Sequence, residues 1–165
     1  YIKRRVEFLM EAHEIKPDTK LCTIIGMSAQ VGIARKYFVK VFKHYDLNIA
    51  PIALNIKDEH LTVTLKGLPN SKIQFSYIEP EYQRSAIHFC DNLNETAKKL
   101  EYIDIIEVND GVATGINLED DARSLFTEGY ELDNNTMLMA KVLLIVKRWY
   151  GINLNIDDIP MLMNK

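Results

Sequence analysis

Apolar residues recur along the chain in two patterns, one with the spacing of an amphipathic helix and one with the short runs of a buried strand. Apolar runs predict strands over residues 21–25, 48–56 and 73–78, and a hairpin of residues 102–108 and 111–116 around Asn109-Asp110-Gly111. Helical spacing predicts helices over residues 1–15, 31–45, 80–91, 94–100, 120–126 and 137–150. Strands that alternate with helices predict an α/β fold with a largely parallel sheet.

Three local features refine this pattern. Residues 60–68 fit a short helix or a strand, because LTVTL alternates and contains β-branched residues. Pro51 places its strand at an edge of the sheet or at a strand start. The polar stretch 127–136 carries turn formers and is the one candidate junction.

Composition and charge narrow the classes of protein. The 165 residues are 47% hydrophobic and 26% charged, with a net charge of −3, which excludes a disordered chain and makes a nucleic-acid partner unlikely. The most apolar stretch, 137–149, is too short to span a bilayer and contains Lys141 and Lys147. We therefore expect a cytoplasmic protein with no membrane partner.

The usual chemical motifs are weak. Cys22 and Cys90 lie in apolar runs and are expected to be free thiols, and the four histidines are too scattered for a zinc site, so no metal is expected. The loop 26–32 follows a strand and precedes a helix, but it does not fit GxGxxG. The acidic run 119–121 fits a helix N-terminus better than a metal site.

Five segments of the chain form an ordered set of motifs. They are Ile24-Ile25-Gly26 with the loop to Arg35 and the helix to Phe42, Asp91 to Ala97, Gly111 to Glu119, Met137 to Lys141, and Trp149-Tyr150-Gly151 with Pro160-Met161. In this order they resemble the shikimate dehydrogenase family. The resemblance implies a three-layer α/β/α fold with a mostly parallel mixed sheet. It covers the substrate-binding domain and the closing helix over residues 21–165, and residues 127–136 stand where the family has its NADP-binding domain. Residues 1–20 resemble the helix and linker of bifunctional enzymes.

The resemblance also locates the positions that bind and react in the family. The two ligand-binding serines fall on Gly32 and Ala34, and the catalytic lysine falls on Tyr82 or Gln83. In the family, a threonine stands just before the proline that precedes the lysine, and this threonine falls on Ile78 or Glu79. Since neither tyrosine nor glutamine is an amine that exchanges protons near neutral pH, we expect no catalytic residue. We also expect no cofactor, because the family's NADP-binding domain is missing here and no Gly-rich loop remains.

Four residues are candidates for ligand binding through the same resemblance: Asp104, Asn117, Glu119 and Lys141. Asp104 takes the place of a neutral asparagine, and the added negative charge disfavours a carboxylate ligand. Two interpretations of Lys141 and Glu119 stay open. They bind a ligand, or they form a salt bridge that plugs a disused pocket.

Three functions follow as expectations. The first is a degenerate, non-catalytic domain that binds a small carboxylate or polyol metabolite, or a protein partner. The second is the substrate-binding half of a shikimate or quinate dehydrogenase, which needs a nucleotide domain in trans. The third is a homo-oligomerising structural domain of a larger multifunctional protein, which forms a homodimer through an exposed face containing Met137 or Leu138.

Overall fold

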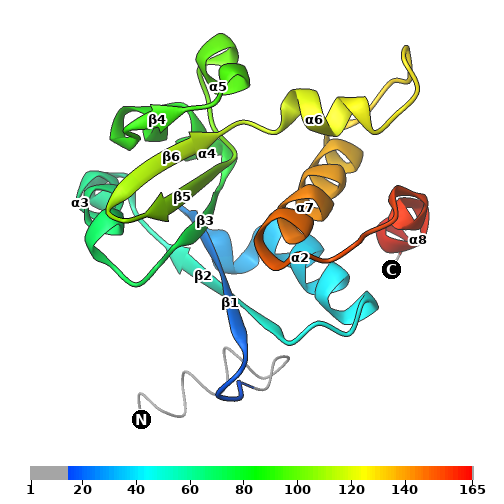
Figure 1. Ribbon diagram of the computed structural model, residues 1–165, viewed down its shortest axis with the longest axis horizontal. Coiled ribbons are helices and arrows are strands. Elements are labelled where there is room, and N and C mark those ends of the chain that lie inside the picture. The colour runs from blue at the N-terminus through cyan, green and yellow to red at the C-terminus, as the bar shows by residue number, and fades with distance from the viewer. Residues whose placement is uncertain (1–14, 165) are drawn as a thin grey trace.

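The computed structural model describes residues 15–164, and the helix predicted over residues 1–15 lies almost entirely outside them. The chain forms one six-stranded sheet with helices on both faces (Figure 1). Among the described residues, no helix is both long enough and apolar enough to cross a lipid bilayer.

The strands are β1 (Lys20–Gly26), β2 (Ile49–Asn55), β3 (Phe75–Ile78), β4 (Asn92–Leu93), β5 (Ile105–Asn109) and β6 (Val112–Ile116). Their order in the sheet is β2-β1-β3-β5-β6-β4. The pairs β1–β2, β1–β3 and β4–β6 are parallel, whereas β3–β5 and β5–β6 are antiparallel. The prediction of a mostly parallel mixed sheet is thus confirmed.

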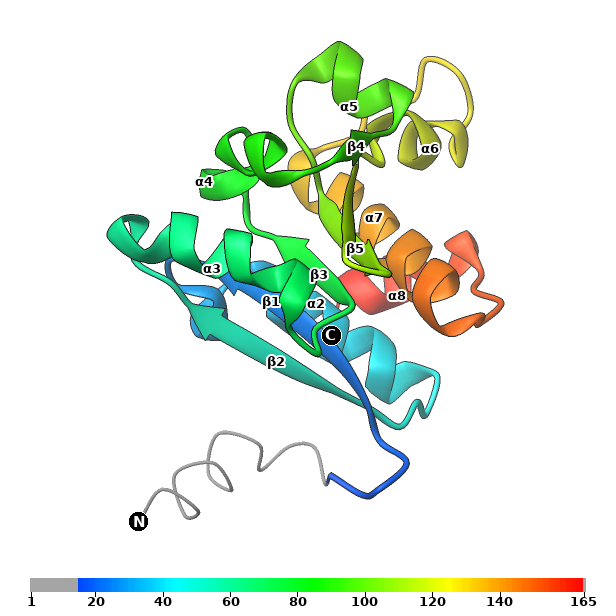
Figure 2. The same cartoon turned by 60° about the vertical axis from the view of Figure 1, so that its left-hand side comes forward.

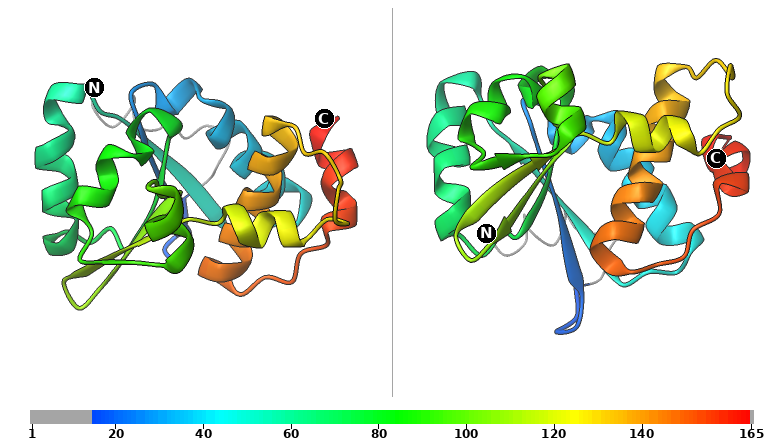
Figure 3. Two further views of the ribbon diagram at one scale, coloured as in Figure 1. Left: turned by 90° about the horizontal axis from the view of Figure 1, so that it is seen from above. Right: turned by 45° about the horizontal axis from the view of Figure 1, so that its top comes forward.

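The helices are α2 (Ile33–His44), α3 (Leu61–Gly67), α4 (Pro80–Gln83), α5 (Glu95–Leu100), α6 (Glu119–Ser124), α7 (Asn134–Tyr150) and α8 (Ile159–Met163). One apolar core joins α2, α7 and α8 to one face of the sheet, and a second joins α3, α4 and α5 to the other. Figures 2 and 3 show the sheet between these two groups of helices. The arrangement is the expected three-layer α/β/α fold.

Several local predictions are confirmed by backbone and capping geometry. Asp110 and Gly111 have φ of 50° and 76°, which suits the tight turn between β5 and β6. Asn94 caps α5 by accepting the Ala97 N–H at 3.0 Å. Pro51 lies on β2, an edge strand.

Other predicted elements differ. The helix predicted over 80–91 ends at Gln83 and continues as a 3-10 turn over Ser85–Phe89. The chain must then turn so that the two residues of β4 can pair with β6, and this pairing overrides the helical pattern. The short strand β4 and the helix α8 are absent from the sequence-based prediction.

The topology brings the ends of four strands together. They form one edge of the sheet, which runs across the strands and not along an edge strand such as β2. β1 and β3 end there, at Gly26 and Ile78. Because β5 runs antiparallel to both β3 and β6, β5 begins and β6 ends at that edge, beside Asp104 and Asn117. Side chains after β3, before β5 and after β6 therefore face one region, which the first turns of α7 close.

Candidate functional site

A cavity of about 310 Å³ lies at this edge of the sheet. Its polar wall includes Glu79, Gln83, Asp104, Glu119 and Lys141. These residues come from the end of β3, from α4, from the residue before β5, from α6 and from α7. The cavity lies at the crevice where α/β sheets commonly bind ligands.

Lys141 is held by two carboxylates. Its Nζ lies 2.9 Å from Asp104 Oδ1 and 2.9 Å from Glu119 Oε2. The lysine side chain is 9% exposed and the Asp104 side chain is 1% exposed. The other oxygen of Asp104 accepts the Leu118 N–H at 2.6 Å. The predicted salt bridge between Lys141 and Glu119 is therefore present, and Asp104 completes it.

This pairing shifts the pKa values of all three side chains. Burial alone would lower the pKa of Lys141, but the two carboxylates outweigh it and raise that pKa. Burial would raise the pKa of Glu119, but hydrogen bonds from Lys141 and Tyr102 lower it. Burial raises the pKa of Asp104, and Lys141 and the Leu118 N–H oppose that rise. Lys141 is thus an ammonium at neutral pH and is a poor proton acceptor.

Asn117 lies beside the cavity, where it positions two of the residues that line it. Its Nδ2 donates to the Tyr102 carbonyl at 3.0 Å, and its Oδ1 accepts the Glu119 N–H at 2.8 Å. Asn94 supports it by exchanging two 3.0 Å hydrogen bonds with its backbone. Of the four predicted ligand-binding residues, Asp104, Glu119 and Lys141 line the cavity, and Asn117 holds Tyr102 and Glu119 in place.

Glu79 also belongs to this site. From the sequence it was only one of two possible positions of the family's threonine, with no role assigned to it. It is 7% exposed, and its Oε1 is buried with no hydrogen-bond partner among the described residues. Burial, followed by repulsion from Glu81, raises its pKa to about 7. A buried carboxyl without a partner is costly, and such groups cluster at functional sites.

The backbone is shaped around Glu79. A Cβ placed on Gly32 would lie 2.6 Å from Glu79 Oε1, and one on Gly26 would lie 2.4 Å from Glu79 Cγ. The glutamate thus occupies the space that a side chain at position 32 would use. Ala34, the second position expected to carry a serine, is fully buried in the core with α2 and α7.

The structure separates the two candidates for the position of the family lysine. Tyr82 is buried in the core with α3, and its hydroxyl donates to the Ile56 carbonyl. Gln83 lines the cavity and donates from Nε2 to the Ile78 carbonyl at 3.0 Å. Gln83 is therefore the residue that faces the site. A glutamine amide does not exchange protons near neutral pH.

Two hydrophobic residues of α7 also line the cavity. Met137 is 8% exposed and Leu138 is partly buried. The expectation that Met137 belongs to an exposed face is therefore wrong, because its side chain covers this end of the sheet. A homodimer stays a prediction that this geometry does not test.

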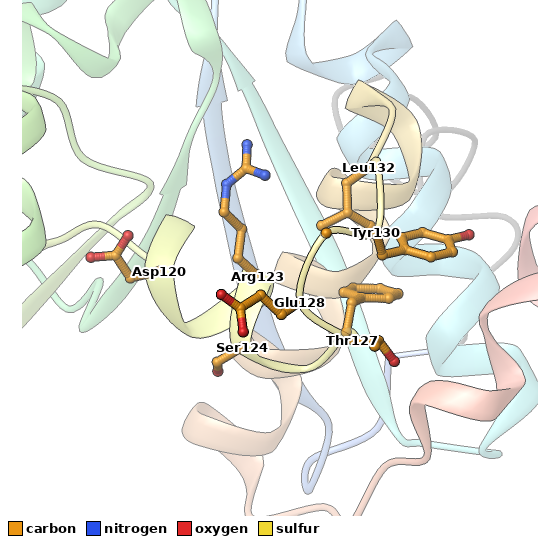
Figure 4. A pocket seen from close by; sticks show the side chains of 9 residues that line it. Asp120, Arg123, Ser124, Thr127, Glu128, Tyr130 and Leu132 are labelled. Atoms are coloured by element: carbon orange, nitrogen blue, oxygen red, sulfur yellow. The ribbon is translucent and has the colours of Figure 1, made fainter.

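The junction predicted over 127–136 forms a loop and the first turn of α7. A pocket of about 380 Å³ lies there, and Figure 4 shows the side chains of Arg123, Glu128 and Tyr130 in its wall. The rings of Phe126 and Tyr130 stack with centroids 5.5 Å apart. The chain passes from α6 to α7 through these few residues.

The weaker motifs have structural roles. Glu119, Asp120 and Asp121 lie in the first turn of α6, and Asp120 pairs with Lys99 at 2.9 Å. Within residues 15–164, no group of three or more His, Cys, Asp or Glu could hold a metal ion. Cys22 and Cys90 are free, and burial raises the pKa of each thiol to about 12.

Searches with the sequence found no matching family model and no matching curated protein. Solved structures do match the fold. A shikimate dehydrogenase in complex with NADP+ superposes with a TM-score of 0.59 at 19% identity, over 68% of this chain and 39% of that one. Shikimate dehydrogenase from Aquifex aeolicus gives 0.57 at 17% identity, over 84% and 45%.

A shikimate 5-dehydrogenase-like protein gives a TM-score of 0.56 at 16% identity, over 86% of this chain and 63% of that one. The chain thus spans between 39% and 63% of the length of these three neighbours. At such identities the likeness concerns the fold alone. The fold is that of a partial shikimate dehydrogenase-like domain, as the sequence motifs predicted.

Proposed function

We propose that this chain is a non-catalytic, shikimate dehydrogenase-like domain that binds a small polar ligand in the cavity beside Lys141. One observation carries the proposal: no side chain in that cavity is free to act as a proton-transferring amine. Gln83 stands at the position that the family resemblance gives to the catalytic lysine. Lys141 lies on another element and is engaged by Asp104 and Glu119.

The charges of the wall also argue against the family's ligand. Three carboxyl groups, those of Glu79, Asp104 and Glu119, face one ammonium. A ligand carboxylate would meet net negative charge, at a cost of about 1–4 kcal/mol for one unpaired contact at 4 Å. Uncharged hydroxyls fit better, since the wall also offers the polar groups of Gln83, Tyr102 and Asn134.

The test combines a turnover assay with a binding measurement. The purified chain is incubated with shikimate and NADP+, and NADPH formation is followed by absorbance. In parallel, the isotope-labelled chain is titrated with shikimate and with scyllo-inositol, an uncharged ring polyol. We expect no turnover, and shifts near Tyr102, Glu119 and Lys141 with the uncharged polyol. Turnover by the chain alone, or tighter binding of shikimate, would refute the proposal.

A variant sharpens the turnover assay. Gln83→Lys restores an amine at the position that faces the cavity, and Glu131→Gln is a matched control in an exposed loop. If the unmodified chain or Gln83→Lys turns over shikimate only after a separate NADP-binding domain is added, the chain is a substrate-binding half that works in trans. If no complex with such a domain forms, that alternative fails.

A further inference from the structure

The unpaired carboxyl of Glu79 is the feature of the cavity that the fold leaves unexplained. The residue is buried, with 7% of its surface exposed, and Oε1 has no hydrogen-bond partner among residues 15–164. Two glycines, Gly26 and Gly32, leave the space that it occupies. A carboxyl buried in this way loses the hydration of the unfolded chain without gaining a donor.

Among residues 15–164, no lysine, arginine or histidine forms an ion pair with this carboxyl. Lys141 is the ammonium in the cavity wall, and two of its three N–H donors are directed to Asp104 and Glu119. Its Nζ also lies 5.5 Å from the centroid of the Tyr102 ring. The neighbouring Glu81 repels the charge of Glu79, and its own Oε1 accepts the Met27 N–H at 2.8 Å.

The titratable groups near Glu79 or in the wall of the same cavity come from several elements. Tyr77 precedes it on β3, Glu81 lies on α4, Asp104 precedes β5, Glu119 begins α6 and Lys141 lies on α7. Arg123 pairs with the other carboxylate oxygen of Glu119. Its Nη2 lies 3.2 Å from Glu119 Oε1, and its side chain is 57% exposed. The inner wall is therefore acidic on balance, and its one unpaired charge is on Glu79.

We propose that the ligand of this cavity carries a protonated amine, which donates to the Glu79 carboxylate, on a small hydroxylated framework. The ammonium supplies the counter-charge that the Glu79 carboxylate lacks among the described residues, in a charge-assisted hydrogen bond to the part of Glu79 that lines the cavity. The cavity of about 310 Å³ suits a single small ring, and Gln83, Asn134 and Tyr102 suit its hydroxyls. An aminocyclitol has this chemistry.

This inference rests on the proposed function, because it names the ligand class of the same cavity. It also predicts a dependence on pH. An amine binds the ionised form of Glu79, so affinity falls as the pH drops through the pKa of about 7. Lys141, whose pKa is raised, and Glu119, whose pKa is lowered, keep their charges across neutral pH.

The test is an NMR titration with two matched ligands. The probes are scyllo-inosamine and scyllo-inositol, which differ by one amine in place of one hydroxyl. We expect the amine to bind at least about tenfold more tightly than the inositol. Its affinity should fall about twentyfold between about pH 7.5 and about pH 5.5, while that of the inositol stays constant.

Variants assign the preference to one residue. Glu79→Gln should bind both probes equally and show no pH dependence, while Glu131→Gln should behave as the unmodified chain. Equal affinity of the two probes for the unmodified chain, or an unchanged preference in Glu79→Gln, would overturn the inference. The pH titration of the unmodified chain decides the matter even if the Glu79 variant folds poorly.

The outcomes separate the two proposals. Binding of the inositol without a preference for the amine overturns this inference and leaves the proposed function in place. Turnover of shikimate, or tighter binding of shikimate than of either probe, overturns the proposed function. If neither probe binds, the inference and the ligand-binding part of the proposed function both fail.

Discussion

Replacing Glu79 by Gln should change how the stability of the protein depends on pH. In the folded chain the pKa of Glu79 is about 7, against an ordinary value of 4.5. Between these two values the folded state binds more protons than the unfolded state, so the free energy of unfolding falls as the pH rises. The loss begins near the ordinary pKa and is complete just above the folded pKa.

The size of the effect follows from the two pKa values. Their difference, 7 − 4.5 = 2.5, multiplied by about 1.36 kcal/mol for each pKa unit, gives about 3 kcal/mol. Glutamine is uncharged and has almost the shape of the protonated acid, so the variant lacks this loss. Part of the loss has already occurred at pH 5, so the stability of the variant relative to the unmodified chain should increase by about 2.5 kcal/mol between pH 5 and pH 8.

The assay is urea unfolding of both proteins at about pH 5 and about pH 8, analysed by linear extrapolation. The difference in unfolding free energy between the two proteins is compared at the two pH values, so that any packing change introduced by the amide cancels. Glu131→Gln, in an exposed loop, is the control and should follow the unmodified chain. If the Glu79 variant and the unmodified chain give parallel pH profiles, the carboxyl is not held in a site that disfavours its charge, and the reasoning is refuted.

Three further substitutions test the site and its support. Lys141→Met should cost about 3–5 kcal/mol in urea unfolding, because it leaves Asp104 buried and unpaired, and adding Asp104→Asn should recover part of that loss; no recovery would contradict the pairing. Asn94→Ala should cost about 1–2 kcal/mol, measured as a lower thermal midpoint, since it removes the cap of α5. Gly26→Ala should destabilise the fold by about 1–3 kcal/mol, because the new Cβ meets the stem of Glu79 at 2.4 Å, and an unchanged urea midpoint would show that the chain relaxes there.

Local physical chemistry made much of the fold predictable from sequence. An apolar run predicts a buried strand wherever both faces are covered, as in β1. Asn94 and Gly151 mark helix ends because one supplies a capping acceptor and the other adopts φ of 68°. Such signals depend on a few neighbouring residues, so they survive without knowledge of the tertiary structure.

Elements that depend on distant pairing were not predictable in the same way. The two residues of β4 have no strand pattern of their own and exist because β6 lies beside them. The helix predicted over 80–91 gives way to a 3-10 turn for the same reason. The hydrophobic period there fits a helix, but the sheet register decides where the chain must turn.

The candidate site was also predictable only in part. The order of motifs along the chain, read through the family resemblance, selected Asp104, Glu119 and Lys141, and the structure brings these three together. Their contact joins residues 15 to 37 positions apart, and only the antiparallel pairing of β5 and β6 and the packing of α7 decide it.

Glu79 could not be assigned a role from its own sequence context. A glutamate before a proline at the end of a strand is more often a solvated helix start than a buried acid. Its burial, its missing donor and its pKa of about 7 arise from Gly26, Gly32 and Glu81 around it. The sequence therefore determined the elements and their order, because these depend on local pattern. The tertiary structure alone decided the charge of the site, because burial and distance set it.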